Sequence, residues 1–166
     1  MVTLSKFKQE DFKYLKSWIS SEEDLIQFAG PLFSYPLKDQ QLLRYIQTDH
    51  FKPYKVTLNE TGETIGHCEL NFENGNNRLS RILIGDKSLR GKNIGTKIVR
   101  EMLNLISIFN DKDPIDLNVF AWNKNAIRCY EKVGFVVNAN KASQYNRNGE
   151  IEEVINMEIQ QPIATN

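Results

Sequence analysis

Hydrophobic positions in the first third of the chain recur mainly at the three- and four-residue steps of helices with one buried face. Ser21 followed by Asp24 has the form of a capping box, which favours a helix start at this point. Gly30 and Pro31 would end that helix, and a loop is expected to follow. The expected elements are a strand over 2–7 and helices over 10–19, 21–28 and 38–47.

The middle of the chain changes to strict alternation of apolar and polar residues, the period of a half-buried strand. Tyr54, Val56 and Leu58 alternate in this way, and the turn-forming run Asn59–Gly62 leads into a second alternating segment. Such a pair of segments predicts a hairpin, and a third strand is expected after the next turn. The sequence therefore predicts an antiparallel meander of strands over 54–58, 64–72 and 78–84.

Helical spacing returns after Gly95 and predicts a long amphipathic helix that ends near Phe109. Further on, Gly134 stands where a glycine commonly ends a helix. The polar segment 144–150 is expected to be a loop between the last two strands. The remaining expected elements are a strand over 115–119, a helix over 125–133, and strands over 135–137 and 154–159.

Composition adds that the chain is an ordinary globular protein, with 40% hydrophobic and 25% charged residues. Its 166 residues fit one domain, expected over 1–160, with a flexible tail at 161–166. The 21 basic residues balance 21 acidic ones, so no overall field would attract nucleic acid. No apolar run reaches the length of a membrane span. We therefore expect a cytoplasmic protein with no nucleic-acid or membrane partner.

Metal chemistry is not expected from the residues that commonly bind metals. The two histidines, His50 and His67, form no HExxH motif, and the chain has no calcium-loop motif. The two cysteines, Cys68 and Cys129, are too far apart in sequence for a CxxC pair. Both are expected to be free thiols.

One segment joins a β-branched run, a basic loop with glycines and the start of the long helix: residues 82–95 read ILIGDKSLRGKNIG. The first amides of a helix have no internal partners, and the helix dipole favours negative charge there. Gly91 and Gly95 would let this backbone approach a ligand closely. The segment therefore predicts a phosphate site, whereas a solvated basic surface with ordinary turn glycines is the alternative. The phosphate-binding motifs GxxxxGK[ST] and GxGxxG are absent.

Two blocks of sequence resemble the GNAT superfamily of acyl-coenzyme A dependent N-acetyltransferases. RGKNIG at 90–95 matches its signature R/Q-x-x-G-x-G/A except at Asn93, which replaces the usual first glycine. Asparagine tolerates left-handed backbone geometry better than most residues, so the loop can still form. The second block follows V-x3-N-x2-A-x3-Y-x3-G-F between Val119 and Phe135. The resemblance is firm over 54–137.

The resemblance implies an α+β fold, in which a mixed, mostly antiparallel sheet splays between its fourth and fifth strands and is flanked by helices. The implied activity is transfer of an acetyl group from acetyl-CoA to a primary amine of a small molecule or a protein N-terminus, by direct attack in a ternary complex. The N-terminal half loosely resembles the branch that acetylates ribosomal-protein N-termini.

The resemblance also implies which residues contact the coenzyme. The backbone of Leu83 and Ile84 would pair with the pantetheine arm, and Asn123 would bond the arm from the opposite side. Tyr130, seven residues after Asn123, is the expected acid for the leaving thiolate, while simple packing is the alternative. The expected pyrophosphate ligands are the backbone amides of Arg90, Gly91, Lys92, Asn93, Ile94, Gly95 and Thr96.

The general base stays open, because an α-amine needs little help at neutral pH whereas a lysine-like amine needs more. Glu69 is the expected base and His67 the alternative, since both would share one strand face with Ile65. The strand before the basic loop contains no acid in the position where the family has a glutamate. A water held by Asp116 and Asn118 is therefore a third possibility.

Acceptor recognition is expected at the loop between the first two helices and at the segment 144–150. The acids Glu22, Glu23 and Asp24 near aromatic residues would attract a polyamine or a basic peptide, although acids also simply favour a helix N-terminus. A non-catalytic acetyl-CoA sensor is the alternative function, and nucleic-acid binding through 87–100 is disfavoured by the neutral net charge. The protein is expected to be a monomer or a homodimer.

Overall fold

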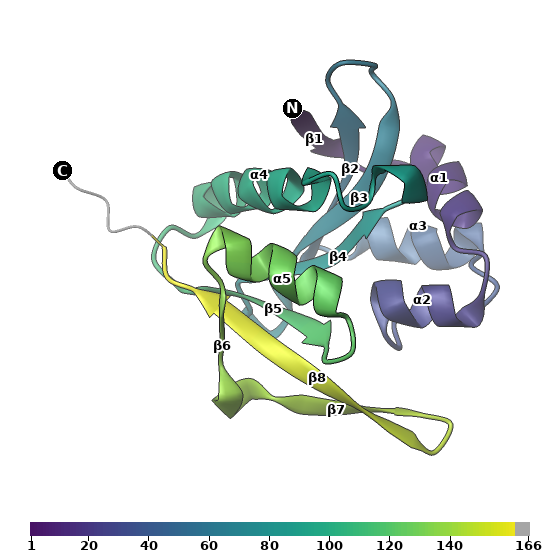
Figure 1. Ribbon diagram of the computed structural model, residues 1–166. Coiled ribbons are helices and arrows are strands. Elements are labelled where there is room, and N and C mark those ends of the chain that lie inside the picture. The colour runs from purple at the N-terminus through teal and green to yellow at the C-terminus, as the bar shows by residue number, and fades with distance from the viewer. Residues whose placement is uncertain (162–166) are drawn as a thin grey trace.

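The computed structural model describes residues 1–161 and arranges the strands in one eight-stranded sheet (Figure 1). The strand order is β1-β2-β3-β4-β5-β8-β6, and β7 pairs with β8. The predicted tail at 161–166 lies outside the described residues except for Gln161. The strands are β1 (Val2–Lys6), β2 (Phe51–Leu58), β3 (Thr64–Asn71), β4 (Arg78–Ile84), β5 (Ile115–Phe120), β6 (Val136–Val137), β7 (Ser143–Arg147) and β8 (Glu150–Ile159).

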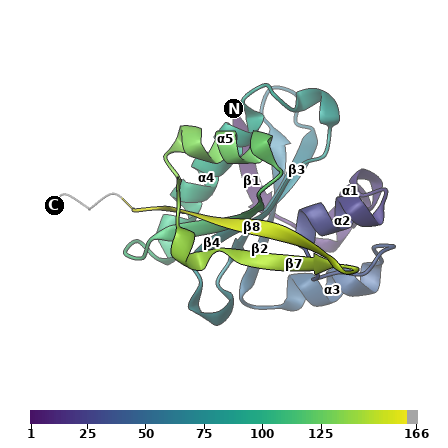
Figure 2. The ribbon, with the colours of Figure 1, turned by 60° about the horizontal axis from the view of Figure 1, so that its bottom comes forward.

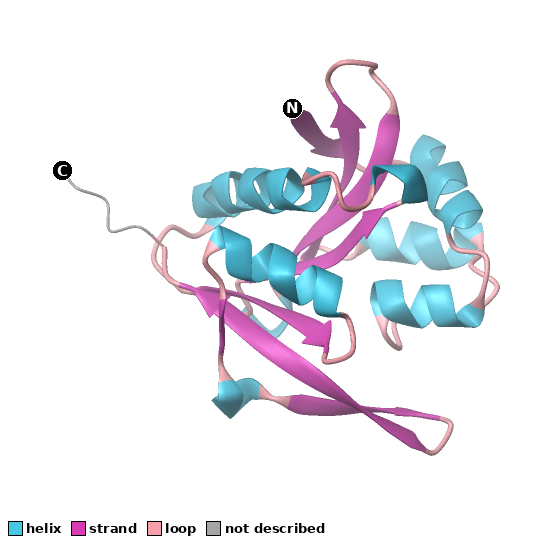
Figure 3. Cartoon of the chain, viewed as in Figure 1, coloured by secondary structure: helices cyan, strands magenta, loops and turns pink. Residues whose placement is uncertain are grey.

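The helices lie where helical spacing predicted them, within a few residues (Figure 3). The Ser21 hydroxyl accepts a hydrogen bond from the Asp24 amide at 3.1 Å, so the expected cap begins its helix. No helix in residues 1–161 is long and apolar enough to cross a membrane. The helices are α1 (Phe12–Trp18), α2 (Glu22–Ala29), α3 (Asp39–Gln47), α4 (Ile94–Phe109) and α5 (Lys124–Val133).

Two hydrophobic clusters pack on the sheet. They lie on opposite faces, because successive side chains of β3 point alternately into one cluster and the other. Cys68 and Leu70 are fully buried in the cluster that α4 contributes to, with α5 packed at its edge. His67, one position away, meets the rings of Phe7 and Phe28 in the cluster built by α1, α2 and α3. The sheet is therefore covered by α4 and α5 on one face and by the first three helices on the other (Figures 1 and 2).

The predicted meander β2-β3-β4 is antiparallel, and it contains two irregularities that re-aim side chains. The ladder between β2 and β3 shifts after the pair Val56 and Gly66, so Ile65 packs with the α4 cluster. The expectation that Ile65 shares a face with His67 is wrong for this reason. In β4, two residues lie opposite Cys68, and the first of them, Arg81, has a left-handed φ of 47°. This bulge bends the strand next to the gap in the sheet.

The sheet opens between β4 and β5, the two parallel neighbours in its centre. Within residues 1–161 these strands pair only at Arg78 and Asp116. The Arg78 guanidinium binds the Asp116 carboxylate through two hydrogen bonds of 2.8 and 2.9 Å, which hold this end closed. Beyond that pair the strands diverge (Figure 1). The predicted splay between the fourth and fifth strands is confirmed.

The segment 144–150, predicted to be a loop, is instead most of a hairpin. Strand β7 pairs with β8 from Ser143 to Arg147, and only Asn148 and Gly149 form the turn. Their φ angles of 51° and 92° are the positive values that a two-residue hairpin turn of type I′ requires, and Asn-Gly is its favoured sequence. The polar side chains concealed this strand because its burial is slight. In Figure 1 the hairpin runs along the lower edge of the molecule.

Candidate functional site

The basic loop after β4 presents the start of α4 as an open anion site. Asn93 is the N-cap of α4 and has left-handed angles, φ 61° and ψ 12°, and Gly91 has a φ of 78°. The expectation that asparagine accommodates left-handed geometry here is confirmed. No side chain caps the first amides of α4, whose donors remain available to a ligand. The Asn93 Oδ1 instead accepts from Lys132 Nζ at 2.9 Å, which ties α5 to this loop.

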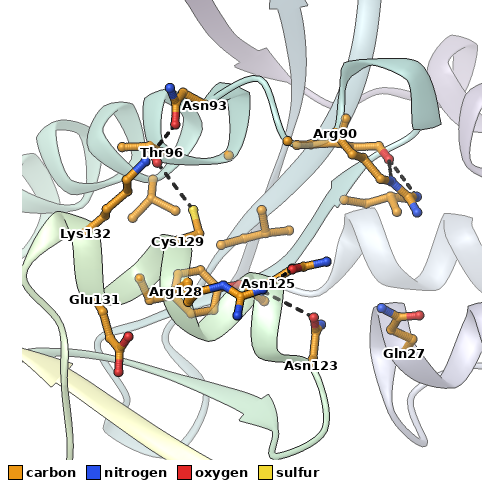
Figure 4. A pocket seen from close by; sticks show the side chains of 18 residues that line it. Gln27, Arg90, Asn93, Thr96, Asn123, Asn125, Arg128, Cys129, Glu131 and Lys132 are labelled. Carbon is orange, nitrogen blue, oxygen red and sulfur yellow. Dashed lines mark hydrogen bonds between the residues drawn. The ribbon is translucent and has the colours of Figure 1, made fainter.

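A cavity of about 750 Å³ lies between β4, the start of α4 and α5 (Figure 4). Two predicted ligands do not line it: Ile94 is buried in the core, and Lys92 is exposed. The role foreseen for both was through their backbone amides, which stays a prediction. The predicted residues that line the cavity are Leu83, Ile84, Arg90, Gly91, Asn93, Gly95, Thr96, Asn123 and Tyr130.

The charged side chains around this cavity are mainly cationic. Arg90 is held at the cavity by hydrogen bonds from its Nε and Nη2 to the Ile84 carbonyl, at 3.2 and 3.0 Å. Arg128 and Lys132 from α5 add two further cations, against one acid, Glu131. Combined with the free amides at the start of α4, this excess favours a ligand with phosphate groups.

Gly95 has a packing role that the sequence did not show. A Cβ atom at this position would lie 3.1 Å from the Cys129 sulfur and 3.8 Å from the Ile84 side chain. The glycine therefore lets α4 approach α5 closely beside the cavity. Cys129 itself lines the cavity and lies 3.6 Å from the Thr96 hydroxyl.

A second cavity, of about 570 Å³, lies on the other side of the splayed strands. Trp18 from α1 forms part of its wall and contacts Gly85 so closely that a Cβ atom there would overlap the indole ring. The two cavities share lining residues from four parts of the chain, and they therefore meet. The shared residues are Gln27, Ile82, Leu83, Arg90, Asn123, Ala126 and Tyr130.

Tyr130 lies at this junction, where α5 passes the gap in the sheet. Its ring meets Phe135 edge to face, with 6.2 Å between the centroids. Burial raises the pKa of the phenol above its usual value, so the hydroxyl stays protonated at neutral pH. A protonated phenol that faces both cavities can donate a proton or a hydrogen bond between two ligands.

Glu69 and His67 lie away from both cavities, in a buried polar network on the α1–α3 side of the sheet. The Glu69 carboxylate accepts hydrogen bonds from Tyr45 and Arg81, and Arg81 is its ion-pair partner. His67 Nδ1 lies 2.9 Å from the Arg81 carbonyl, and its Nε2 lies 3.3 Å from the Tyr45 hydroxyl. The network therefore holds the bulged residue of β4 by both its side chain and its backbone.

Burial shifts the proton equilibria of this network in opposite senses. It raises the pKa of Glu69 to about 7, although the nearby Arg81 opposes the rise. It lowers the pKa of His67 to about 4, so the imidazole is neutral at physiological pH.

The two residues expected to hold a water share one partner, because Asn156 Nδ2 donates to Asp116 Oδ2 and to Asn118 Oδ1, at 3.0 Å each. Asp116 is bound by Arg78, by Asn156 at 3.0 Å and by Lys141 at 3.5 Å. Burial alone would raise the pKa of Asp116, but hydrogen bonds from Arg78 and Asn156 lower it below its usual value. Asn118, in contrast, lines the second cavity.

Comparison with known protein families shows which family this chain belongs to. The model of the acetyltransferase (GNAT) domain matches residues 1–136, which is most of the chain. The chain belongs to the GNAT acetyltransferase family. It is thus an acetyl-CoA dependent N-acetyltransferase, and the fold expected from the resemblance is confirmed.

Relatives of this GNAT acetyltransferase act on amines. It is 29% identical over 152 residues to the aminoglycoside N(6')-acetyltransferase type 1 of Klebsiella pneumoniae, which covers 81% of this chain and 73% of that protein. The spermidine N-acetyltransferase of Vibrio cholerae, solved with coenzyme A and spermine, superposes with a TM-score of 0.77 at 18% identity, covering 96% of this chain and 95% of the other. The aminoglycoside acetyltransferase AAC(6')-Ib with coenzyme A superposes with a TM-score of 0.68 at 25% identity, covering 94% of each chain.

The residues of the first cavity fit the coenzyme that GNAT acetyltransferases use. Its cations and the uncapped start of α4 suit the phosphate groups of the coenzyme. Beyond Arg78, strand β4 has no ladder partner on the β5 side within the described part of the chain, so its backbone can form hydrogen bonds with a ligand there. Asn123 Oδ1 caps α5 by accepting from the Ala126 amide at 3.3 Å, which leaves its Nδ2 group to donate to a ligand. No group of three or more metal-binding side chains occurs in residues 1–161.

Sequence reasoning missed several residues that line the first cavity. Arg128 and Lys132 are spaced four apart, so their common face on α5 was available as a signal. Cys129 and Asn125 could be assigned only with that face known. Gln27 comes from α2, far away in the sequence, and only the tertiary structure brings it to the cavity.

Proposed function

We propose that this acetyltransferase transfers the acetyl group of acetyl-CoA to a primary amine by direct attack within a ternary complex. The observation that carries the proposal is the junction of the two cavities at Tyr130 and β4. The first cavity has the features of a coenzyme site, and the second reaches the same strand from the acceptor side. Two ligands bound in this way would meet at the gap without a covalent enzyme intermediate.

Within that complex the residues of the chain position the reactants and move one proton. Acetyl-CoA supplies an activated thioester carbonyl. The backbone of Leu83 and Ile84 and the Nδ2 group of Asn123 would hold the pantetheine arm from opposite sides of the gap. The amides of 90–96 would bind the pyrophosphate. Tyr130, whose phenol is protonated at neutral pH, would donate its proton to the leaving thiolate.

Glu69 remains our candidate for the general base, and the pKa of about 7 supports this role because it matches neutral operating pH. Its burial behind Arg81 requires a proton relay from the second cavity. A neutral His67 and a water held at Asn118 are the alternatives. A nucleophile that enters as the free amine would need none of them.

The names of the relatives support an amine acceptor, since they include aminoglycoside and spermidine acetyltransferases. The looser resemblance to N-terminal acetyltransferases of ribosomal proteins stays a prediction. A single domain over 1–160, a monomer or homodimer, and a cytoplasmic location are also part of this proposal. The free thiols of Cys68 and Cys129 support that location. A Vibrio cholerae spermidine N-acetyltransferase has been described as a dodecamer.

Release of coenzyme A thiol tests the proposal directly. The protein is incubated with acetyl-CoA and with amines of different classes, against a control that lacks the acceptor. Acceptor-dependent thiol release, with an acetylated amine found by mass spectrometry, is the expected result. Binding of acetyl-CoA without release to any amine, including peptides, would favour the sensor function instead.

Gly95→Asp tests the coenzyme site separately. A carboxylate beside the start of α4 should repel the phosphate groups, and we expect the affinity for coenzyme A to fall by at least about tenfold. Gly95→Asn adds a side chain of the same size without charge, so it controls for the contact with Cys129. Calorimetry with equal affinities for the two variants would contradict the assignment.

A further inference from the structure

The second cavity, which the proposed function assigns to the acceptor, is lined by more cations than acids. Its acids are Asp24 and Glu73. Its cations are Arg78, Arg81, Lys87 and Arg90, of which Arg90 is shared with the coenzyme cavity. An acceptor that carries several positive charges would therefore meet an excess of like charge.

The two least exposed cations that line the cavity are paired with carboxylates that do not line it. Arg81 and Arg78 line the cavity with side chains that are 12% and 20% exposed. Their partners, Glu69 and Asp116, are 0% and 7% exposed and do not line it. The two ion pairs use Nε and Nη2 of Arg78 and Nη1 of Arg81, which leaves Nη1 of Arg78 and Nη2 of Arg81 to donate to a ligand in the cavity.

The acids of the cavity are already engaged by neighbouring groups. Asp24 Oδ2 accepts hydrogen bonds from the Ser20 amide and hydroxyl, at 3.1 and 3.0 Å. Glu73 lies 3.7 Å from His50 in a pair whose two side chains are both slightly less than half exposed. The acids Glu22 to Asp24 form the first turn of α2, where they interact favourably with the helix dipole. Asp24 and Glu73 keep their negative charges, but the four cations that line the cavity outnumber them.

We propose that the acceptor of this enzyme is an amine that also carries a carboxylate, which the guanidinium groups of Arg78 and Arg81 recognise. The inference rests on the proposed function and narrows its acceptor class. Guanidinium is the side chain best suited to bind a carboxylate, because its planar donors match the two oxygens. Nearby cations also disfavour the ammonium form of the acceptor, and so increase the fraction of neutral, nucleophilic amine.

This acceptor class differs from the polyamines and aminoglycosides in the names of the relatives. Those molecules carry several amines, which are cationic at neutral pH. Here the cavity would face such a molecule with Arg78, Arg81 and the exposed Lys87. The lining also includes the aromatic residues Trp18, Phe28 and Tyr145, which suit the carbon skeleton of a small amine.

Three amines of equal length provide the test: 6-aminohexanoate, 6-aminohexanamide and 1,6-diaminohexane. They share one primary amine and differ only in a distal carboxylate, neutral amide or ammonium group. We expect kcat/KM for acetyl transfer to fall in that order, with the carboxylate preferred over the diamine by on the order of tenfold or more. A matched peptide set, glycylglycine and its C-terminal amide, repeats the comparison with a shorter and stiffer skeleton.

A charge reversal at the cavity tests whether its positive charge contributes to the preference. Lys87→Glu places an acid at a lining position that is exposed and has no ion-pair partner among residues 1–161. It should shift the ratio of carboxylate to diamine kcat/KM toward the diamine by about tenfold. Lys112→Glu makes the same change in net charge at an exposed loop residue that lines neither cavity, and should leave the ratio unchanged.

The outcomes separate this inference from the proposed function. Transfer to 1,6-diaminohexane or spermidine at rates equal to or above those of the carboxylates would overturn the carboxylate assignment alone. A preference that Lys87→Glu and Lys112→Glu change equally would also overturn it. Absence of transfer to every amine, with coenzyme A binding intact, would overturn the proposed function and the inference with it.

Discussion

Tyr130 is the residue on which the two cavities converge, and its hydroxyl can be removed without disturbing its packing. In Tyr130→Phe the ring still meets Phe135, whereas the proton donor at the gap is lost. We expect kcat to fall by about a hundredfold, with a smaller change in the KM for acetyl-CoA. Tyr54→Phe is the control, because Tyr54 is buried in the core and lines neither cavity. Equal turnover in both variants would assign Tyr130 to packing.

Glu69 and His67 give the stability of the protein two opposing pH dependences. The folded protein keeps a proton on Glu69 up to a pKa of about 7, from an ordinary value of 4.5, so stability from this group falls as pH rises through that window. The pKa of His67 falls from 6.5 to about 4, so the unfolded chain binds the extra proton and stability rises with pH there. Where the windows overlap, the two effects offset each other.

Single variants should expose each contribution. Glu69→Gln removes the Glu69 contribution, so its free energy of unfolding should rise more steeply with pH than that of the wild type between about 4.5 and about 7. His67→Gln should show a steeper fall than the wild type between about 4 and about 6.5. Urea unfolding at four pH values measures both. Curves parallel to the wild type would show that neither group titrates as its burial implies.

At the residue scale, the sequence could not reveal that Glu69 and His67 are buried. Glu69 and His67 were assigned to a strand face from alternation, and that alternation is real for them. Whether the face meets solvent, substrate or other helices depends on Tyr45, which lies on α3, more than twenty residues earlier. Tyr130 and Asn123, in contrast, both line the first cavity, because their motif fixes them on one helix and its cap.

At the scale of elements, the start of α4 depends on one left-handed residue. Asn93 occupies a φ of 61°, which costs a residue with a Cβ and no polar side chain roughly 1 kcal/mol relative to glycine. We therefore expect Asn93→Ala to be about 1 kcal/mol less stable than Asn93→Gly. Both variants lose the hydrogen bond to Lys132, so the pair isolates the backbone effect. Chemical denaturation measures it, and equal midpoints with equal slopes would contradict it.

Most elements were predictable because their periodicity is strong. Helices with a clear apolar face and the meander of alternating strands lie where expected. The strand β7 was missed because it is a polar strand with little burial, and only the Asn-Gly pair at 148–149 marked it. The bulge at Arg81 leaves no local signal, since it arises where buried partners from β3 and α3 hold that residue.

At the scale of the whole molecule, the two parts of the sheet meet in the centre through one pair, Arg78 and Asp116, within the described residues. A ligand in the first cavity would contact β4 on one side and α5 on the other. Coenzyme A at a hundredfold excess over its Kd should therefore stabilise the fold by roughly 2.7 kcal/mol.

Hydrogen exchange locates that stabilisation. Protection should increase most for β4, the start of α4 and α5, while β1 at the far edge of the sheet should change least. Gly95→Asp, measured at the same coenzyme concentration, should show little of either effect. An equal gain in β1 and β4 would contradict binding at the gap.

The contact of Trp18 with Gly85 constrains how this enzyme can change over evolution. A substitution at 85 would push the indole, and with it the end of α1, away from β4. The contact therefore fixes the position of Trp18, which lines the second cavity, relative to the end of β4. Homologues that keep a tryptophan at 18 should keep glycine at 85, and drift at 85 should follow only after a smaller residue has appeared at 18. New acceptor specificities would then arise more readily from the β7–β8 hairpin, which also lines the second cavity. The side chains of β7 are largely exposed, and the glycine of the hairpin, Gly149, has no atom within 4 Å of an added Cβ among the described residues.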